Sequence, residues 1–520
     1  MATTKEMNST NYKRIAKNTM YMYFRMLFVM AVSIYTSRVI LQALGVTDYG
    51  LYNVVGGVVG LLSFVNDTLS QGTSRFLMFE LGAGDAKKLK DTFSTLLTTH
   101  IILALIIVLI AETIGLWFVY NKLNVPASRL DAGVFVYHIS ILTAFFSLTQ
   151  APYSASIKSH ERMDIYAYTS IVDVSAKLGI VYLLSVSPMD KLEFYAILLC
   201  VEQVGMIIFY RFFCVAHFPE TKYKFTFDKT ILKQVLGYTS WNFFSNISTV
   251  LNTQGMTILI NMFFAPAVVA SLAIANTVKN AALSFVQNFR LASIPQIVKQ
   301  YAAGNHDESQ KLLMLTTRYS FFLLYFLCLP LYLCAYEVLK LWLGQVPEYS
   351  VIFLKYVILI CIFDLFVSCF FTALDVLARI KEYSIIFPSI MILCFPVVYV
   401  FFKLGFSPVT VTAVLLVSYI ILGVIILPIL IVRIAHYNYR EILGLFKICG
   451  MVAVCSLPIP ILCNYYFAEQ GVLIKFLTTG FACVLSVGAS AWFLGVNKME
   501  KQKIVSIVKS KFFKRRNGNA

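Results

Sequence analysis

Six ionisable side chains lie deep inside apolar segments of the sequence. They are Arg25, Asp173, Lys177, Glu202, Lys279 and Asp364. A charge near the middle of a bilayer costs about 2.5 to 3.5 kcal/mol on insertion scales, so such a residue usually faces a cavity or pairs with another charge. Phosphates that leave water need charge-assisted hydrogen bonds as compensation. We therefore predict that the cations Arg25, Lys177 and Lys279 bind an anionic substrate.

Each of these cations also has a structural interpretation. Arg25 lies about two turns from the start of its apolar segment, so its side chain could extend to the lipid headgroups. Asp173 and Lys177 are spaced i, i+4, which favours a neutralising pair on one helix. Lys279 has no acidic residue within one helical turn in the sequence, and it is therefore the strongest candidate.

Three carboxylates lie at similar depth and predict a site that couples transport to an ion gradient. Asp173, Glu202 and Asp364 could each take up a proton or a sodium ion, or pair with a buried cation elsewhere in the chain. Both interpretations stay open from the sequence.

Three further charges flank apolar segments at their ends. Asp67 and Arg75 flank the cytoplasmic end of the second segment, and Arg290 ends the eighth. These positions predict a cytoplasmic gate, or else mark the membrane surface.

The elements that must position these residues are long apolar helices. Hydrophobic residues make up 59% of the 520 residues, charged residues only 13%, and the mean hydropathy is +0.76, which excludes an ordinary soluble enzyme. Runs of roughly 20 apolar residues match the thickness of a bilayer, so we predict an all-α polytopic membrane protein of about 14 transmembrane helices. The helices are expected near residues 19–43, 51–70, 95–120, 134–157, 166–186, 192–214, 238–264, 268–289, 315–336, 350–373, 384–404, 409–434, 445–467 and 471–495.

The spacing of these helices predicts five parts. Two six-helix lobes occupy residues 1–216 and 238–436, with a polar cytoplasmic linker at 217–237, a terminal helix pair at 437–497 and a basic tail at 498–520.

Positive charge is distributed unevenly between the two sides of the membrane. The side that holds both termini carries 32 of the 43 Lys and Arg residues, against 6 on the other side. Because cytoplasmic loops keep an excess of positive charge, both termini are predicted to be cytoplasmic. The net charge of +17 then reflects membrane orientation, and no nucleic-acid partner is expected.

The two lobes are related by an internal repeat. Residues Gly45 to Asp67 align without gaps on Pro266 to Asn288, at a shift of 221 residues, and share the motif LSFV. An even number of helices in each lobe relates the lobes by an axis along the membrane normal. We therefore expect a cationic central cavity between them that opens alternately to the two faces as one lobe rocks against the other.

The segment from Ser37 to Phe76, SRVILQALGVTDYGLYNVVGGVVGLLSFVNDTLSQGTSRF, carries a family resemblance. With its L-G-x-x-x-Y-G-L-Y pattern it resembles the first helical hairpin of Wzx-type oligosaccharide-lipid flippases. These flippases belong to the multidrug, oligosaccharidyl-lipid and polysaccharide (MOP) exporter superfamily, whose plan of duplicated six-helix halves with an optional terminal pair is similar to the plan predicted here.

The resemblance implies that the chain moves a polyprenyl-pyrophosphate-linked oligosaccharide from the cytoplasmic to the periplasmic leaflet of a bacterial inner membrane. It also implies a polysaccharide polymerase or export machinery as partners in the assembly of a surface polysaccharide such as O-antigen. An ion-coupled exporter of drugs or metabolites from the same superfamily is the first alternative. A membrane glycosyltransferase or polymerase is disfavoured, because the sequence has no D-x-D motif and no phosphate-binding loop. The six histidines lack metal-ligand spacing, so neither a metal nor a cofactor is expected.

Overall fold

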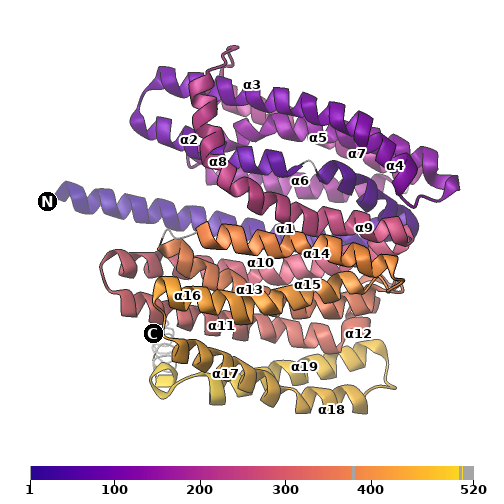
Figure 1. Ribbon diagram of the computed structural model, residues 1–520, viewed down its shortest axis with the longest axis vertical. Coiled ribbons are helices and arrows are strands. Elements are labelled where there is room, and N and C mark those ends of the chain that lie inside the picture. The colour runs from indigo at the N-terminus through magenta and orange to yellow at the C-terminus, as the bar shows by residue number, and fades with distance from the viewer. Residues whose placement is uncertain (1, 62, 185, 378–380, 503–505, 507–520) are drawn as a thin grey trace, which may run out of the picture. The chain divides into compact units, whose positions relative to one another are not determined.

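A computed structural model describes residues 2–61, 63–184, 186–377, 381–502 and 506. Among these, the side chains of residues 2–23, 63–68, 71, 236–243, 291–292, 295 and 381 are not described. The described residues form helices and short connections, without a strand (Figure 1), as the apolar sequence predicts. The helices of the first half of the chain are α1 (Ala2–Gly60), α2 (Ser63–Ala83), α3 (Ala86–Ile110), α4 (Leu116–Lys122), α5 (Leu130–Ser159), α6 (Met163–Leu183) and α7 (Lys191–His217).

The second half of the chain continues the same pattern of long helices. It contains α8 (Lys229–Val250), α9 (Met256–Phe263), α10 (Pro266–Ala302), α11 (His306–Leu333), α12 (Ala335–Leu343), α13 (Ser350–Val376), α14 (Lys381–Lys403), α15 (Thr410–Ile420), α16 (Leu427–Ala435), α17 (Tyr439–Ser456), α18 (Pro458–Tyr466) and α19 (Val472–Ser490). Short π-helical segments continue several spans without a break. They are Ala111–Gly115 between α3 and α4, Leu251–Gly255 between α8 and α9, Ile421–Ile426 between α15 and α16, and Ala491–Gly495 after α19.

Eleven helices in the described part of the chain are long and apolar enough to cross a membrane. The protein is therefore a polytopic membrane protein, as predicted. The three other expected spans, near 51–70, 166–186 and 238–264, correspond to α2 with the end of α1, to α6, and to α8 with α9. These segments are helical but more polar; α6, for example, carries Asp173 and Lys177.

The boundary between the first and second expected spans is a kink inside α1. Gly45 has φ 78° and ψ 171° there, a conformation that favours glycine. The helices that contain the second span of each predicted lobe, α2 and α10, end alike. Each is followed by a glycine with positive φ, Gly84 at 77° and Gly304 at 81°. This agreement is a further likeness between the two halves.

By contacts between Cα atoms the chain divides into two units. The first comprises Met1–Val278, Pro347–Phe353 and Lys381–Leu415, and the second comprises Lys279–Val346, Leu354–Ile380 and Leu416–Ala520. The division into two six-helix lobes, a linker and a terminal pair rests on the sequence repeat and stays a prediction.

Unit 1 has a core of apolar side chains from α2, α3, α5, α7 and α8. Leu77, Phe93, Leu96 and Ile157 are almost completely buried in it, and α5 packs against α2, α3 and α7. Side chains cap the starts of α3, α7 and α8; Asp85, for example, accepts hydrogen bonds from the backbone of Lys87 and Lys88. Apolar burial thus holds together the helices of unit 1.

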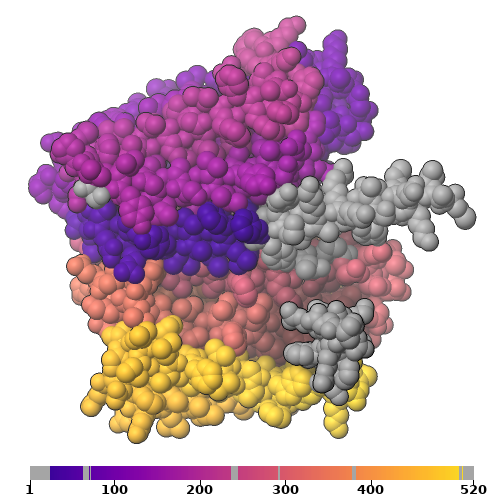
Figure 2. Space-filling view, turned by 180° about the vertical axis from the view of Figure 1, so that it is seen from behind, coloured from indigo at the N-terminus to yellow at the C-terminus, as the bar shows by residue number. Residues whose placement is uncertain are grey.

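In unit 2 the terminal helices pack against α11. Helices α17 and α19 both contact α11, and Figure 2 shows the C-terminal residues in yellow as one continuous surface. An ion pair of 2.7 Å joins Lys475 of α19 to Glu337 of α12. A second pair joins Arg318 of α11 to Glu500. The expected terminal helix pair is thus anchored by charge as well as by apolar packing.

Candidate functional site

Two cations of unit 1 gather on one aromatic ring. The guanidinium carbon of Arg25 on α1 and the Nζ of Lys158 on α5 both lie 4.8 Å from the centroid of the Tyr166 ring on α6. Cations are attracted to the face of such a ring. Arg25 is half-buried, and its Nε is buried without a hydrogen-bond partner among the described residues. This arrangement leaves donor capacity for an anion.

Lys158 is not among the site residues that the sequence predicts. It lies in the last turn of α5, and in the sequence it looks like one of many loop lysines. Only the fold brings it to the ring that Arg25 also contacts, so no signal in the sequence could have singled it out.

A second cluster in unit 1 contains three of the predicted residues. The Nζ of Lys177 lies 2.6 Å from the Oδ1 of Asp173, one turn earlier on α6, and Asp173 and Glu202 lie close enough to interact electrostatically. Glu202 is on α7, and its Oε1 is buried without a partner among the described residues. Two neighbouring carboxyl groups can share one proton, because a protonated carboxyl gains a donor that a carboxylate lacks.

The predicted residues of unit 2 form a separate set. Asp364 on α13 lies close enough to Lys279 and Arg290 on α10 to interact electrostatically with both. The Nζ of Lys279 lies 5.9 Å from the centroid of the Tyr419 ring. Lys279 has no acidic neighbour in sequence, but the fold supplies one from another helix.

The three predicted gate residues have different surroundings. The Nη2 of Arg290 donates hydrogen bonds to the Ser368 carbonyl at 2.7 Å and to the Thr372 hydroxyl at 3.0 Å, so Arg290 links α10 to α13. Arg75 is exposed on α2. The side chain of Asp67 lies outside the described residues. Their role as a gate stays a prediction.

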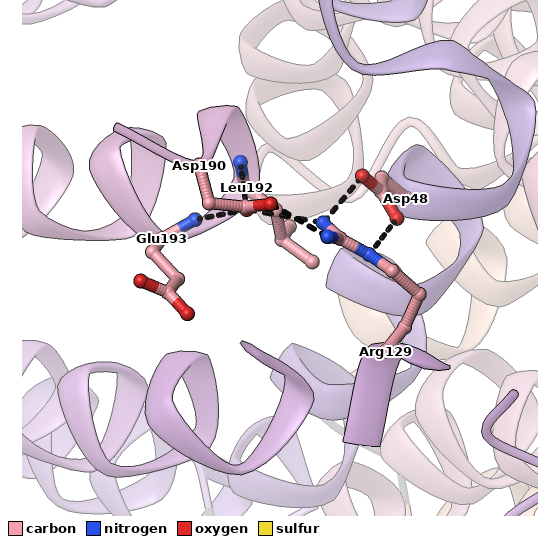
Figure 3. A network of polar contacts seen from close by, with 5 residues as sticks. All are labelled: Asp48, Arg129, Asp190, Leu192 and Glu193. Carbon is pink, nitrogen blue, oxygen red and sulfur yellow. Dashed lines mark hydrogen bonds and ion pairs between the residues drawn. The ribbon is translucent and has the colours of Figure 1, made fainter. Parts of the chain in front are cut away.

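An ion-pair network that the sequence analysis missed joins three connections of unit 1 (Figure 3). Arg129, just before α5, donates to both carboxylate oxygens of Asp48 at 2.9 and 2.6 Å. It also donates to both oxygens of Asp190 at 2.6 and 3.0 Å. Asp190 additionally caps α7 by accepting from the backbone N–H groups of Leu192 and Glu193.

This network lowers the pKa of one of its carboxyl groups. The pKa of the Asp190 carboxyl is lowered from its ordinary value of 3.8, first by its hydrogen bonds with Arg129 and then by the N–H groups of α7. The Asp-Lys-Leu-Glu sequence at 190–193 signals a helix cap. It does not signal Arg129, which is 61 residues away in the chain.

A further missed pair lies at the π-helical segment that follows α3. The Nδ1 of His138 on α5 lies 2.9 Å from the Oε2 of Glu112, and the Tyr137 hydroxyl donates to the Ala111 carbonyl at 2.8 Å. Glu112 interrupts the apolar sequence IIVLIAETIGLWF, a signal that could have identified it. Among the described residues, no group of three His, Cys, Asp or Glu side chains could hold a metal ion.

Comparisons with known proteins agree with this fold. A family model described as polysaccharide biosynthesis protein matches residues 39–351, whereas no curated protein matches the sequence. A structure of the lipid II flippase MurJ in an inward closed conformation is similar to this chain with a TM-score of 0.69 at 11% identity, over 92% of this chain and 100% of that one.

Two other solved structures share the fold. An inward-facing multidrug resistance MATE family transporter of the MOP superfamily has a TM-score of 0.64 at 13% identity, over 80% of this chain and 96% of that one. A MOP superfamily transporter from Pyrococcus furiosus has a TM-score of 0.53 at 12% identity, over 81% of this chain and 96% of that one. Identities this low support likeness of fold alone, and the predicted fold of this superfamily is confirmed.

Proposed function

We propose a function for this chain from its family and fold. The chain belongs to the family of polysaccharide biosynthesis proteins, and it is a multi-pass membrane transporter by family and fold. In this proposal it moves a polyprenyl-pyrophosphate-linked oligosaccharide from the cytoplasmic to the periplasmic leaflet of a bacterial inner membrane, by alternating access. Both termini are cytoplasmic, and the product passes to a polysaccharide polymerase or export machinery.

The observation that carries this proposal is the pair of cations on Tyr166. Arg25 and Lys158 lie on the same ring, and neither has an ion-pair partner within the part of the chain that the structure describes. A pyrophosphate carries more than one negative charge, and its transfer out of water requires several charge-assisted donors. Lys279 is a separate candidate cation in unit 2, where Asp364 lies close enough to interact with it electrostatically.

We assign ion coupling to the Asp173, Lys177 and Glu202 cluster, and we propose a proton as the coupling ion. Asp173 and Glu202 lie close enough to interact, so the two carboxyl groups can share one proton, whereas the Lys177 ammonium already occupies the position beside Asp173 that a sodium ion would take. In this scheme Lys177 positions the carboxyl pair and does not touch the substrate, so its earlier assignment to substrate binding is replaced.

An ion-coupled exporter of drugs is the second candidate function. The shared fold with a multidrug resistance transporter and the carboxyl pair favour it. Against it, Arg25 and Lys158 would repel the cationic compounds that a proton-driven drug exporter removes.

The experiment that separates the two candidates is depletion of the protein in its native cell, followed by leaflet-resolved measurement of polyprenyl-pyrophosphate glycan. The flippase proposal expects the glycan lipid to accumulate on the cytoplasmic face while surface glycan is lost. Unchanged glycan lipid together with increased sensitivity to cationic drugs would overturn it in favour of the exporter.

Complementation with variants tests the cations directly. We expect Lys279→Ala to remove surface glycan while the protein still inserts into the membrane. Lys311→Ala is the matched control, because Lys311 forms an exposed pair with Glu308 at 3.6 Å. Normal surface glycan with a well-expressed Lys279→Ala variant would contradict the role of Lys279.

A further inference from the structure

The connection between α7 and α8 contains an extended segment, residues 222–228, which we call the strap. The strap is held to α3 by hydrogen bonds. The backbone N–H groups of Lys224 and Asp228 donate to Ser94 and Thr95 at 3.4 and 3.3 Å. The Thr98 hydroxyl lies 3.0 Å from the Tyr223 hydroxyl. Although the sequence predicts a polar linker here, the strap has a fixed path along one helix.

The position of the strap on α3 places it near the edge of the hydrocarbon layer. Ser94 to Thr98 lie at the start of the apolar run of α3, and in a membrane-spanning helix the exposed apolar side chains of this run are expected to face lipid. These are Ile102, Leu105, Ile106 and Leu109, with exposed fractions of 44%, 56%, 48% and 65%. Thr98 and Ile102 are one helical turn apart, or about 6 Å. The strap therefore lies at the depth of the lipid headgroups.

The strap alternates aromatic and cationic side chains, and it exposes both kinds. Phe225 is 76% exposed and Phe227 41% exposed, which is unusual for phenylalanine outside a span. Lys222, Lys224 and the adjacent Lys229 are also exposed.

The acidic residue of the strap does not neutralise these lysines. The Asp228 carboxylate accepts the Thr230 backbone N–H at 2.7 Å and so caps α8. Within the described residues, the three lysines have no acidic partner in an ion pair.

We propose that the strap is a membrane-surface anchor for anionic phospholipids. Phe225 and Phe227 insert between the headgroups, and Lys222, Lys224 and Lys229 contact the lipid phosphates. Aromatic rings are favoured at the membrane interface, and each lysine near an anionic surface strengthens binding roughly fivefold. Because the strap leads directly into α8, the anchor fixes the start of that helix at the membrane surface.

The first test measures lipid binding by the full-length protein in detergent. Native mass spectrometry would compare the binding of phosphatidylglycerol and phosphatidylcholine to the wild type and to the triple variant Lys222→Gln, Lys224→Gln, Lys229→Gln. We expect the wild type to prefer phosphatidylglycerol, and the triple variant to lose roughly tenfold or more of that preference. Equal binding of the two lipids by the wild type would overturn the proposal.

The matched control makes the same change of charge on α3, the helix along which the strap runs. Lys87, Lys88 and Lys90 lie in the first turns of α3, farther from its apolar run than the strap, so their replacement by Gln should change the preference much less. An equal loss in both triple variants would overturn the proposal, because the effect would then be one of net charge. Thermal melting of each variant establishes that it is folded.

The second test measures the depth of Phe225. The variant Phe225→Trp would be reconstituted in vesicles of phosphatidylglycerol with brominated or unbrominated acyl chains. We expect brominated lipid to quench the added tryptophan beyond the quenching of the wild-type tryptophans. An unquenched Trp at this position would show that the strap points into water, and it would overturn the insertion even if the lysines bind lipid.

Discussion

The Arg129 guanidinium donates two hydrogen bonds to the Asp190 carboxylate, at 2.6 and 3.0 Å. The same guanidinium is also bidentate with Asp48. Asp48 follows the kink at Gly45, Arg129 precedes α5 and Asp190 caps α7. One side chain thus joins three connections at one end of unit 1, and by the predicted orientation this end is periplasmic.

Replacement of Arg129 should therefore destabilise unit 1. The side chain of Arg129 is only 24% exposed, and Arg129→Gln would leave two partly buried carboxylates beside each other. We expect a loss of about 1–3 kcal/mol, the usual cost of an unpaired buried polar group, seen as a lower melting temperature in detergent. Arg162→Gln is the control, since Arg162 forms a local, more exposed pair with Asp164. A loss of stability no larger than that of the control would contradict this role of Arg129.

The stability that Asp190 contributes should depend on pH in one direction. Because folding lowers the pKa of the Asp190 carboxyl from 3.8, its contribution is complete above about pH 4 and is lost as pH falls through the lowered pKa. The variant Asp190→Asn retains the cap of α7 but lacks the charge. We expect it to melt below the wild type at pH 7 and to approach the wild type near pH 3. If the difference in melting temperature between Asp190→Asn and the wild type stays constant over this pH range, the charge of Asp190 does not contribute to stability.

The fold was largely predictable from the sequence, because a bilayer forces every span into one apolar helix. The apolar runs located the spans, and the positive φ of Gly84 and Gly304 is a further likeness between the two halves that the LSFV repeat did not predict. The more polar spans were also located, because α6 keeps its apolar residues on both sides of Asp173 and Lys177.

The candidate site was only partly predictable, because its residues meet through contacts between distant helices. The i, i+4 spacing predicted the pair of Asp173 and Lys177, whereas nothing in the sequence placed Glu202 beside it. Arg129 and Lys158 looked like ordinary loop cations, since the sequence carries no sign of which carboxylate or ring a cation will contact.

Lys158 should contribute to binding of the anionic substrate. Lys158→Gln removes one of the two cations on Tyr166 but retains a similar length and polarity. We expect weaker binding of polyprenyl-pyrophosphate glycan, roughly tenfold for a lost charge-assisted hydrogen bond, measured with purified protein in nanodiscs. The salt dependence of binding should also decrease. Unchanged affinity would leave Arg25 as the cation of this site and remove Lys158 from it.

Glu202 should be needed for proton coupling. In Glu202→Gln the amide can donate a hydrogen bond to a neighbouring carboxylate, but it cannot release a proton. We expect substrate binding to persist while substrate-dependent proton movement across proteoliposomes is lost. The control is Glu112→Gln, which removes a different carboxylate, the one that pairs with His138. If Glu112→Gln abolishes proton movement and Glu202→Gln does not, the coupling site is the Glu112 pair.

Gly50 and Gly56 offer a matched test of packing on one helix. A Cβ at Gly50 would lie 1.9 Å from the Pro266 carbonyl oxygen, whereas one at Gly56 would have no atom within 4 Å. Because the contact at Gly50 is with backbone, relief requires movement of the start of α10, and overpacking of this kind typically costs about 1–3 kcal/mol or more. We therefore expect Gly50→Ala to lower the melting temperature and the yield of folded protein. Gly56→Ala should be neutral or stabilising by up to about 1 kcal/mol, since alanine is the better helix former. Equal stability of the two variants would mean that α1 and α10 do not approach this closely in the membrane.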